Sequence, residues 1–315
     1  MALGRESDGD GDGDGDDEEV FVDAQDSSYD IEDLNTIYNE KSQFTGLMSK
    51  YWPQRFTYFS KFNDGAMMTK ELWFSVTPEN IAKFTAKLMK LALSDKESPL
   101  YVMDAFAGAG GNVVFLVESF DVVFAVDINY IHLHCTQNNA SLYHSREVIA
   151  QKLKLLPLNW SYADDTIDEG YVDEVFENSK EVSDIVDRVY ANKADSMESL
   201  QVLRGIKLDC IFGSPPWGGP EYTQQRPYNL NHLLPFGLEK LLKVLLKFTD
   251  NIVLFLPRTS DLQQMQQVTL DIFHNTKYIR VFRTYSLGKP KGLVCCWGPA
   301  FVDVDIQDMV DLMDG

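Results

Sequence analysis

Residues 100–112 read LYVMDAFAGAGGN and combine three features of a ligand-binding α/β unit. The apolar run from Leu100 to Met103 is typical of a buried strand, and the acidic residue Asp104 ends it. Glycines follow at positions 108, 110 and 111, where the lack of a side chain lets the backbone pass close to a ligand. A helix expected from about Gly111 would offer its first amide groups to the same ligand. The stretch therefore predicts a strand, a glycine-rich turn and a helix.

Strand-like and helix-like segments alternate along the rest of the chain. The pattern predicts a helix from His132 to Leu142 and strands at DVVFAVDI (121–128), LDCIFGSPP (208–216) and NIVLFLP (251–257). Strands that alternate with helices predict an α/β fold with a parallel sheet. The last two runs, YIRVFRTYSL (278–287) and KGLVCCWGPAFV (291–302), are joined by Gly288-Lys289-Pro290-Lys291 and predict a hairpin at an antiparallel edge of the sheet.

The segments outside this alternation predict the domain organisation. Residues 1–37 contain Gly-Asp repeats that cannot bury apolar surface, so we expect a disordered acidic tail. Residues 38–76 mix aromatic with basic side chains and predict the short helices of an N-terminal lobe. The main domain is expected over residues 77–306 and opens with a helix from Pro78 to about Leu93, for which Thr77 is a natural N-cap. Residues 307–315 form a C-terminal tail.

The formal net charge of −20 is unevenly distributed along the 315 residues. Residues 1–33 contain 14 Asp or Glu and one Arg, and residues 160–200 contain 12 Asp or Glu and three Lys or Arg. The remaining chain has a net charge of +2. Phosphate binding depends on where the cations lie rather than on their total, so the acidic composition does not exclude a nucleic-acid substrate. We expect the acidic stretch 160–200 to be a surface insertion in the main domain.

Other protein classes are disfavoured by the composition. The cysteines at 135, 210, 295 and 296 form no CxxC pair and no metal motif with His, so neither a structural zinc site nor a disulfide framework is expected. The chain begins without the apolar run of a signal peptide and lacks the roughly 18 apolar residues of a membrane span, so we expect a soluble intracellular protein. The histidines form no catalytic arrangement, and His132 and His134 are expected to pack against the domain.

Asp104 and Asp127 are the acids expected at a cofactor site. A glycine-rich turn of this kind serves a dinucleotide, S-adenosylmethionine or the fold alone. Asp104, directly before the glycines, suits the cationic amino-acid part of S-adenosylmethionine better than a pyrophosphate. Asp127 ends the next strand, 23 residues further on, where an acid holds ribose hydroxyls; the alternative is an N-cap for the helix beginning near Asn129. The two acids together favour S-adenosylmethionine as the cofactor.

The segment SPPWGGPEY, residues 214–222, follows an apolar strand and carries the most specific signal. Prolines fix the backbone and have no N–H group, so the carbonyls of Ser214 and Pro215 can accept hydrogen bonds from the exocyclic amine of a base. Trp217 offers a flat face on which that base can stack. The alternative is a rigid turn with a buried tryptophan. The position at the carboxyl end of a strand, where ligands bind in open α/β sheets, favours base binding.

These segments together resemble the trimethylguanosine synthase family, the RNA cap guanine-N2 methyltransferases. The resemblance covers about Lys50 to Gly298 and is carried, in order, by KYWPQRFTYFSKFNDG, WFSVTPE, DAFAGAGGN, AVDIN, SPPWGGPEY and FLPRTSD. It implies a class I S-adenosylmethionine-dependent methyltransferase, with a seven-stranded sheet, an antiparallel last strand and a helical lobe over the active site. The implied substrate is the 7-methylguanosine cap of small nuclear and nucleolar RNAs, methylated twice at N2 in the nucleus or nucleolus. Partners would include snRNP or snoRNP proteins.

The same resemblance implies roles for individual residues. The expected cofactor contacts are Asp104, Phe106, Gly108, Gly110 and Asn112 in the glycine-rich turn, Asp127 at the ribose and Asn159 of LPLNW beside the adenine. At the substrate, Ser214 and Pro215 would orient the amine and Trp217 would stack on the guanine, while Phe74, Lys70 and Arg258 would approach the cap or its phosphates. The cations available to the triphosphate are Arg55, Lys61, Lys70, Arg258, Lys289 and Lys291.

The expected chemistry needs neither a metal nor a covalent nucleophile, because a sulfonium methyl group is already activated and the protein has chiefly to position the amine. A 7-methylguanine carries a positive charge, so its stacking on Trp217 would gain a cation–π contribution over plain guanine. The same motifs also suit an adenine-N6 or a ribosomal guanine-N2 methyltransferase. A third interpretation is a non-catalytic scaffold that binds the cofactor.

Overall fold

The computed structural model describes residues 36–163, 196–219, 226–274 and 278–305, together with residues 184, 186, 187, 190 and 191. Nearly all of the predicted disordered tail (1–37), the predicted C-terminal tail (307–315) and most of the acidic stretch 160–200 lie outside the described residues. None of the described helices combines the length and the apolar character that a membrane crossing needs. The four cysteines are buried free thiols.

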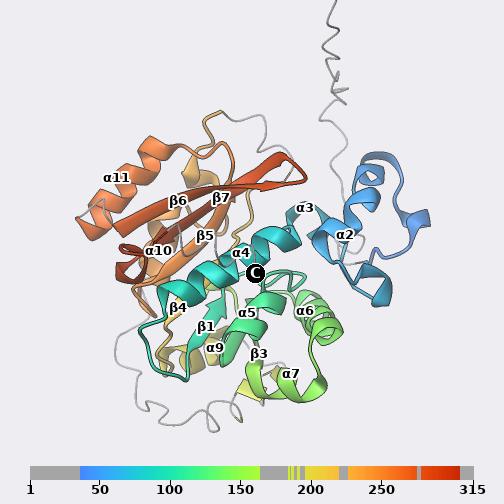
Figure 1. Ribbon diagram of the computed structural model, residues 1–315, viewed down its shortest axis with the longest axis horizontal. Coiled ribbons are helices and arrows are strands. Elements are labelled where there is room, and N and C mark those ends of the chain that lie inside the picture. Colours follow the sequence, from blue (N-terminus) through green and yellow to red (C-terminus); the bar gives the residue numbers. More distant parts are fainter. Residues whose placement is uncertain are drawn as a thin grey trace, which may run out of the picture.

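A seven-stranded sheet lies at the centre of the molecule (Figure 1), in the order β3-β2-β1-β4-β5-β7-β6. The strands are β1 Tyr101–Asp104, β2 Val122–Asp127, β3 Leu153–Pro157, β4 Cys210–Gly213, β5 Ile252–Pro257, β6 Ile279–Ser286 and β7 Lys289–Trp297. The first five strands pair in parallel, and β7 lies antiparallel between β5 and β6. The predicted α/β fold, with a parallel sheet and an antiparallel hairpin, is confirmed.

Helices cover both faces of the sheet (Figure 1) and create two apolar cores. One face carries α4 Glu79–Ala92, α5 Val113–Ser119, α6 Tyr130–Tyr143 and α7 Arg146–Lys152, and the other carries α9 Ser196–Arg204, α10 Leu238–Leu245 and α11 Leu262–Phe273. Neighbouring strand residues alternate between the cores, as Val102 and Met103 do. Because both faces are buried, the central strands are continuously apolar, which explains the pattern of the sequence.

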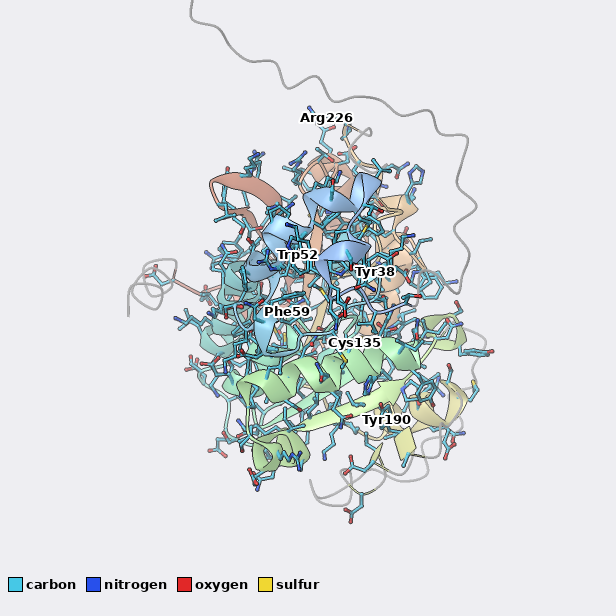
Figure 2. All side chains as sticks on the ribbon, turned by 90° about the vertical axis from the view of Figure 1, so that its right-hand side faces the viewer. Tyr38, Trp52, Phe59, Cys135, Tyr190 and Arg226 are labelled. Atoms are coloured by element: carbon cyan, nitrogen blue, oxygen red, sulfur yellow. The ribbon has the colours of Figure 1, made fainter. Side chains whose placement is uncertain are left out.

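The N-terminal lobe is built from short helical pieces, including α2 Arg55–Tyr58 and α3 Leu72–Ser75, and shares its core with the main domain. Phe44, Phe62 and Trp73 belong to the same apolar cluster as residues of α4 and α5. The rings of Phe44 and Trp73 meet edge to face with centroids 4.7 Å apart. Figure 2 shows the lobe lying over helix α6, which carries Cys135. The lobe is therefore packed against the sheet domain rather than tethered to it.

Three local expectations differ from the structure. Helix α4 begins at Glu79 with Pro78 as its N-cap, because the Thr77 hydroxyl instead accepts a hydrogen bond from Asn112 Nδ2. The hairpin turn lies at residues 287–288, and Lys289 already belongs to β7. His132 is buried as expected, but His134 is exposed, since it lies on the outer side of helix α6.

Strand β3 and the ends of the acidic stretch show where the apolar pattern was insufficient. Lys154 lies within β3 and is 2% exposed, with its Nζ donating to the Ala150 carbonyl at 2.8 Å. A lysine at that position conceals the strand from a search for apolar runs. Trp160 is buried and donates its Nε1–H to the Ala105 carbonyl at 2.8 Å, and helix α9 begins at Ser196. Both ends of the 160–200 stretch therefore belong to the packed domain.

Asn139 of helix α6 joins the lobe to the main domain. Its Oδ1 accepts a hydrogen bond from Met67 N at 2.7 Å, and its Nδ2 donates to the carbonyls of Met67 (2.7 Å) and Ala109 (2.8 Å). The side chain is completely buried. One amide thus satisfies three backbone groups, two in the lobe and one in the glycine-rich turn.

Asn139→Ala should lower the free energy of unfolding by about 2–4 kcal/mol, because it leaves those three backbone groups buried without partners. Urea unfolding followed by tryptophan fluorescence measures the loss. Gln137→Ala, on the exposed side of the same helix, is the matched control and should change stability by less than about 0.5 kcal/mol. Equal losses in the two variants would contradict the bridging role of Asn139.

Candidate functional site

The strand order places a crevice between β1 and β4. The chain proceeds from β1 outward to β3 and then returns to β4 on the other side of β1, so the loops after β1 and β4 diverge. Ala105 N donates to the Phe212 carbonyl at 2.8 Å. A Cβ added at Gly213 would lie 3.2 Å from the Phe106 ring. The structure therefore brings the glycine-rich turn and the base of the SPPW segment together, as the sequence predicted.

Asp104 lies at the bottom of this crevice and is 0% exposed. Its Oδ1 accepts a hydrogen bond from Phe106 N at 3.1 Å, while its Oδ2 is buried and has no hydrogen-bond partner among the residues that the structure describes. Burial raises the pKa of Asp104 to about 7; the Phe106 hydrogen bond lowers that pKa, and the charge of Asp127 raises it. A buried acid with one oxygen unsatisfied fits a ligand that presents a cationic amino group.

Asp127 ends β2 beside the glycine-rich turn. Its Oδ2 accepts a hydrogen bond from Gly108 N at 2.9 Å, and its Oδ1 accepts one from Asn129 N at 2.9 Å. The N-cap of helix α6 is Asn129 itself, whose side chain accepts from Ile131 N. Asp127 is therefore not the cap of that helix. A carboxylate oxygen has two acceptor positions, so Oδ2 of Asp127 can also accept a ligand hydroxyl.

Helix α6 presents a polar stripe to the site that the sequence analysis missed. His132, Thr136 and Asn139 are buried at positions i, i+4 and i+7 and share one helical face. His132 Nδ1 lies 3.3 Å from Asp127 Oδ1, and its Nε2 lies 3.3 Å from Thr69 Oγ1 in the lobe. Thr136 Oγ1 donates to the Gly108 carbonyl at 3.0 Å. Polar residues at this spacing on one face of a helix, in line with its buried apolar residues, are the signal that would have revealed the stripe.

Two glycines allow the turn to fit between α6 and the lobe. Gly110 has φ +78, and a Cβ there would lie 2.9 Å from Thr136 Cα. Gly108 has φ +53, and its Cβ would lie 3.1 Å from Leu72 Cδ2 of helix α3. A side chain at either position would be strained and crowded. The glycine-rich turn is therefore enclosed by α6 on one side and by the lobe on the other.

Asn112 and Asn159 both hold the chain around the crevice. Asn112 is buried and donates its Nδ2–H to Thr77 Oγ1 at 3.0 Å, which attaches the glycine-rich turn to the start of α4. Asn159 follows β3, next to the end of β2, and its Oδ1 accepts a hydrogen bond from Ser161 N at 3.0 Å. Its backbone N donates to Ser196 Oγ at 2.9 Å. The half-buried Asn159 thus borders the site beyond Asp127.

The SPPW segment continues from β4 with an ordered set of carbonyls. The Pro216 carbonyl accepts from Leu234 N, and the Trp217 carbonyl accepts from Tyr228 Oη, each at 3.0 Å. Within the described ranges of the chain, no N–H or O–H group donates to the carbonyls of Ser214 and Pro215. These are the two carbonyls that the sequence analysis assigned to an incoming amine.

The Trp217 indole is half-buried rather than enclosed in the core. Its Nε1–H donates to the Phe255 carbonyl at 3.3 Å, and the two rings lie 5.4 Å apart with a tilt of 54°. Phe255 belongs to β5, so the indole is held at the carboxyl edge of the sheet. This arrangement differs from the alternative of a buried tryptophan in a rigid turn.

The residues expected at the cap come from two parts of the chain: Phe74 and Lys70 from the lobe, and Arg258 from the segment after β5. Phe74 is half-buried at the end of α3 and meets Tyr51 edge to face at 5.4 Å, and Lys70 Nζ lies 5.9 Å from the Tyr38 ring centroid. Arg258 is exposed directly after β5 and donates from Nη1 to the Pro290 carbonyl at 3.2 Å.

Two other expected cations are used to hold the lobe together. Arg55 donates to the Trp52 carbonyl at 2.9 Å and stacks over the Phe56 ring at 4.2 Å. Lys61 Nζ donates to the Leu142 carbonyl at 2.7 Å. Both side chains thus have structural partners, and their expected role as triphosphate ligands stays a prediction.

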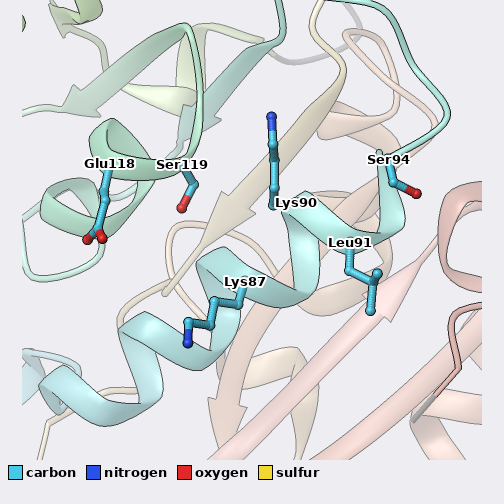
Figure 3. Close-up of a pocket in the computed structure, with 6 residues that line it drawn as sticks. All are labelled: Lys87, Lys90, Leu91, Ser94, Glu118 and Ser119. Atoms are coloured by element: carbon cyan, nitrogen blue, oxygen red, sulfur yellow. The ribbon is translucent and has the colours of Figure 1, made fainter. Parts of the chain in front are cut away.

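A separate concavity lies at the opposite edge of the sheet. It has a volume of about 540 Å³ and is lined by Lys87, Lys90, Leu91, Ser94, Glu118 and Ser119 (Figure 3). Helix α5 starts at the glycine-rich turn and ends at Ser119, so this pocket is one helix length from Asp104 and contains none of the predicted site residues. Among the described residues, no cluster of His, Cys, Asp and Glu is arranged to hold a metal ion.

Comparison with known proteins adds an independent line of evidence. A family model described as RNA cap guanine-N2 methyltransferase matches residues 100–300. The trimethylguanosine synthase of Saccharomyces cerevisiae is 34% identical over 277 residues, which are 87% of this chain and 74% of that protein. The trimethylguanosine synthase of Schizosaccharomyces pombe is 27% identical over 250 residues, 79% of this chain and 85% of that protein.

Among solved structures, one from Porphyromonas gingivalis W83 that is classed as a methyltransferase has a TM-score of 0.50 and 14% sequence identity to this chain. The match covers 80% of this chain and half of that one. At this identity the likeness concerns the fold alone. It agrees with the seven-stranded α/β sheet described above.

Asp104→Asn should stabilise the cofactor-free protein at pH 8 while removing its affinity for S-adenosylmethionine. The folded-state pKa of Asp104, about 7, exceeds the ordinary aspartate value of 3.8, so wild-type stability falls as the pH rises between these values, by up to about 4 kcal/mol. The neutral amide avoids this loss but cannot pair with a cation. Thermal melts at pH 5 and pH 8 and calorimetry with the cofactor measure the two effects.

Asp250→Asn, at an exposed aspartate, is the control and should alter neither the melting temperature nor the cofactor affinity. For the wild type, cofactor affinity should increase as the pH rises toward 8, because Asp104 must lose its proton to pair with the amino group. An Asp104→Asn variant that binds the cofactor normally would refute the assignment.

Proposed function

The chain belongs to the RNA cap guanine-N2 methyltransferase family, and from this premise we propose that it converts the 7-methylguanosine cap into 2,2,7-trimethylguanosine by two successive methyl transfers. The methyl donor is S-adenosylmethionine. The observation that best supports the proposal is the pairing of two turns at one crevice. One turn has the buried acid Asp104, and the other has the carbonyls of Ser214 and Pro215, which no described residue uses as acceptors.

We propose that the glycine-rich side of the crevice holds the cofactor. Asp104 would pair with its amino group, the backbone around Gly108 and Gly110 would surround its methionine part, and Asp127 would hold the ribose hydroxyls. Phe106 and Asn159 would border the adenosine, and Asn112 would keep the turn in place through Thr77. The unsatisfied Oδ2 of Asp104 is the feature that fits this ligand best.

The base would occupy the SPPW side of the crevice. When bound, the cofactor supplies a methyl group on a positively charged sulfur, which makes that carbon electrophilic. The carbonyls of Ser214 and Pro215 would accept both hydrogens of the guanine amine and so orient its nitrogen lone pair. Trp217 would hold the ring by stacking, and the amine proton would leave to water after the transfer. Positioning by backbone acceptors replaces a general base in this scheme.

The 7-methyl group gives the ring a positive charge, which strengthens stacking on Trp217 by about 0.5–2 kcal/mol relative to guanine. Phe74 of helix α3 would complete the pocket from the lobe, residues 38–76, which would cover the active site. Arg258 and Lys70 would meet the cap phosphates. The cap is therefore preferred to an internal guanine for an electrostatic reason.

We further propose small nuclear and small nucleolar RNAs as the substrates, because the yeast relatives are trimethylguanosine synthases. The location would then be the nucleus, and the RNA would reach the protein within snRNP or snoRNP particles. Side-by-side assays on capped RNA, uncapped RNA and an adenine-containing oligonucleotide separate this function from adenine-N6 or ribosomal guanine-N2 methylation.

Mass spectrometry of a 7-methylguanosine-capped dinucleotide after incubation with the protein and S-adenosylmethionine tests the proposal directly. The product should gain one and then two methyl groups, both on the terminal guanine. The same dinucleotide without the 7-methyl group should be a poor substrate. Methylation of an adenine, or of uncapped RNA at the same rate, would overturn the proposed function.

Trp217→Ala should lower kcat/KM for the capped dinucleotide about 10- to 100-fold, because the base loses its stacking surface. Cofactor affinity, measured by calorimetry, should be unchanged. Trp217→Phe should recover part of the activity, since a smaller aromatic ring still stacks. A Trp217→Ala variant that methylates the cap at the wild-type rate would show that the indole does not hold the base.

A further inference from the structure

The β6–β7 hairpin is basic although the whole chain is strongly acidic. Residues 278–302 contain four Lys or Arg and no Asp or Glu, whereas the chain has a formal net charge of −20. Arg280 is used by the fold, because its Nη1 donates to the carbonyls of Phe301 and Val304. The other three cations are Arg283, Lys289 and Lys291, and none of them forms an ion pair within the described part of the chain.

Lys289 and Lys291 lie with Arg258 at the end of the hairpin, and Arg283 and Tyr285 lie on the adjoining part of β6. These five residues are here named the hairpin patch. Arg258 contacts the hairpin through the Pro290 carbonyl. Burial lowers the pKa of Lys291, and the charges of Lys289 and Arg258 lower it further. Lys289 and Arg258 therefore both lie within electrostatic reach of Lys291. Like charges kept together without an acid among their described neighbours attract anions.

The hairpin patch lies beside the proposed cap site. Pro257, the last residue of β5, pairs with Gly292, so the pairs Tyr285–Pro290 and Ser286–Lys289 continue beyond the end of β5. Figure 1 shows the end of this hairpin extending toward helix α3 and the lobe. The hairpin is fixed there because Asn80 Nδ2 donates to the Tyr285 carbonyl at 2.8 Å and Lys291 Nζ lies 3.4 Å from Gln54 Oε1.

A chain of contacts connects the patch to Trp217. The Trp217 ring packs on Phe255, and a Cβ at Gly292 would lie 2.4 Å from the same Phe255 ring. Lys291, next to Gly292, is the extra residue of a bulge, because Thr284 pairs with Gly292 while Tyr285 pairs with Pro290. Bulges redirect side chains at the edges of sheets. Phe255 and Gly292 are thus the residues that link the Trp217 indole, which would stack on the cap, to Lys291 of the patch.

An aromatic ring accompanies these cations. Tyr285 is 52% exposed and, by the alternation of β6, shares a face with Arg283 and with the exposed Val281. An exposed aromatic ring between cations provides base stacking and phosphate contacts together, which is how proteins bind single-stranded nucleic acid without sequence preference. An acidic peptide would use the cations but would have no need of the tyrosine ring.

We propose that the hairpin patch binds the single-stranded RNA that directly follows the cap, through its phosphates and by stacking of a base on Tyr285. The proposal rests on the proposed cap methylation and extends it from the cap to the RNA body. It explains how an acidic protein retains an RNA chain, since the cations are gathered on the one hairpin that borders the crevice. Binding should be independent of RNA sequence and weakened by salt.

The experiment compares a capped dinucleotide with a capped, unstructured RNA of about ten nucleotides, a length within the site sizes of single-strand-binding surfaces. For the wild type, KM should be lower for the longer RNA and should rise with salt. The double variant Arg283→Ala, Tyr285→Ala should raise KM for the longer RNA about 10- to 100-fold and leave the dinucleotide KM and both kcat values unchanged. Tyr285→Phe should behave as wild type.

Lys207→Ala is the matched control, because Lys207 is exposed at the opposite edge of the sheet, before β4. An unchanged KM for the longer RNA in the double variant, or an equal rise for both substrates, would overturn the proposal. Fluorescence anisotropy measures binding of the longer RNA in parallel, and this measurement does not depend on methylation. If the wild type binds it but methylates neither substrate, the proposed function fails while the RNA surface stands. If the variant still binds the longer RNA but no longer binds a peptide of residues 1–33, the patch binds an acidic segment and the proposal fails.

Discussion

An unsatisfied carboxylate oxygen at the bottom of the crevice is the constraint around which the site is built. A buried acid without a partner opposes folding, so the surrounding chain has to hold it in place. The hydrogen bond of Ala105 to Phe212 does so from strand β4, and that of Trp160 to Ala105 does so from the segment after β3. In the proposed complex a cationic ligand would offset the penalty at Asp104, and ligand binding would add to the stability of the turn that receives it. Folding and cofactor affinity would then make opposite demands on this one side chain.

Helix α6 connects the two halves of the site. Its polar stripe contacts Asp127 through His132, the glycine-rich turn through Thr136, and the lobe through Asn139. The lobe in turn rests on Gly108 through Leu72 of helix α3. The side chains that would hold the cofactor and the lobe that would cover the cap are thus positioned by the same helix. A displacement of the lobe would change the position of His132, which contacts Thr69 of the lobe on one side and Asp127 on the other.

Charge is separated along this chain rather than balanced. Two acidic stretches account for the whole negative charge, and the β6–β7 hairpin contains no acid. The hairpin is tied to the lobe through Gln54 and to helix α4 through Asn80, so its cations stay beside the crevice. Phe255 stands between them and the Trp217 indole. In the proposed complex one RNA molecule would stack its cap on Trp217 and meet the hairpin cations with its phosphates, while the two acidic stretches repel polyanions.

Local sequence determined the strand, turn and helix around Asp104, most of the parallel strands, the hairpin and the SPPW segment. Apolar runs, glycines and prolines set the burial and the backbone conformation of the residues immediately around them. It did not reveal strand β3, whose Lys154 interrupts the apolar pattern, or the packed ends of the acidic stretch. The tertiary structure alone decided which polar groups have partners. Arg55 and Lys61 hold the lobe while Arg258 stays exposed, and Asn139 meets Met67 across 72 positions of the chain. Such choices depend on contacts between residues far apart in sequence, where burial sets the cost of an unpaired group, and no local pattern contains that information.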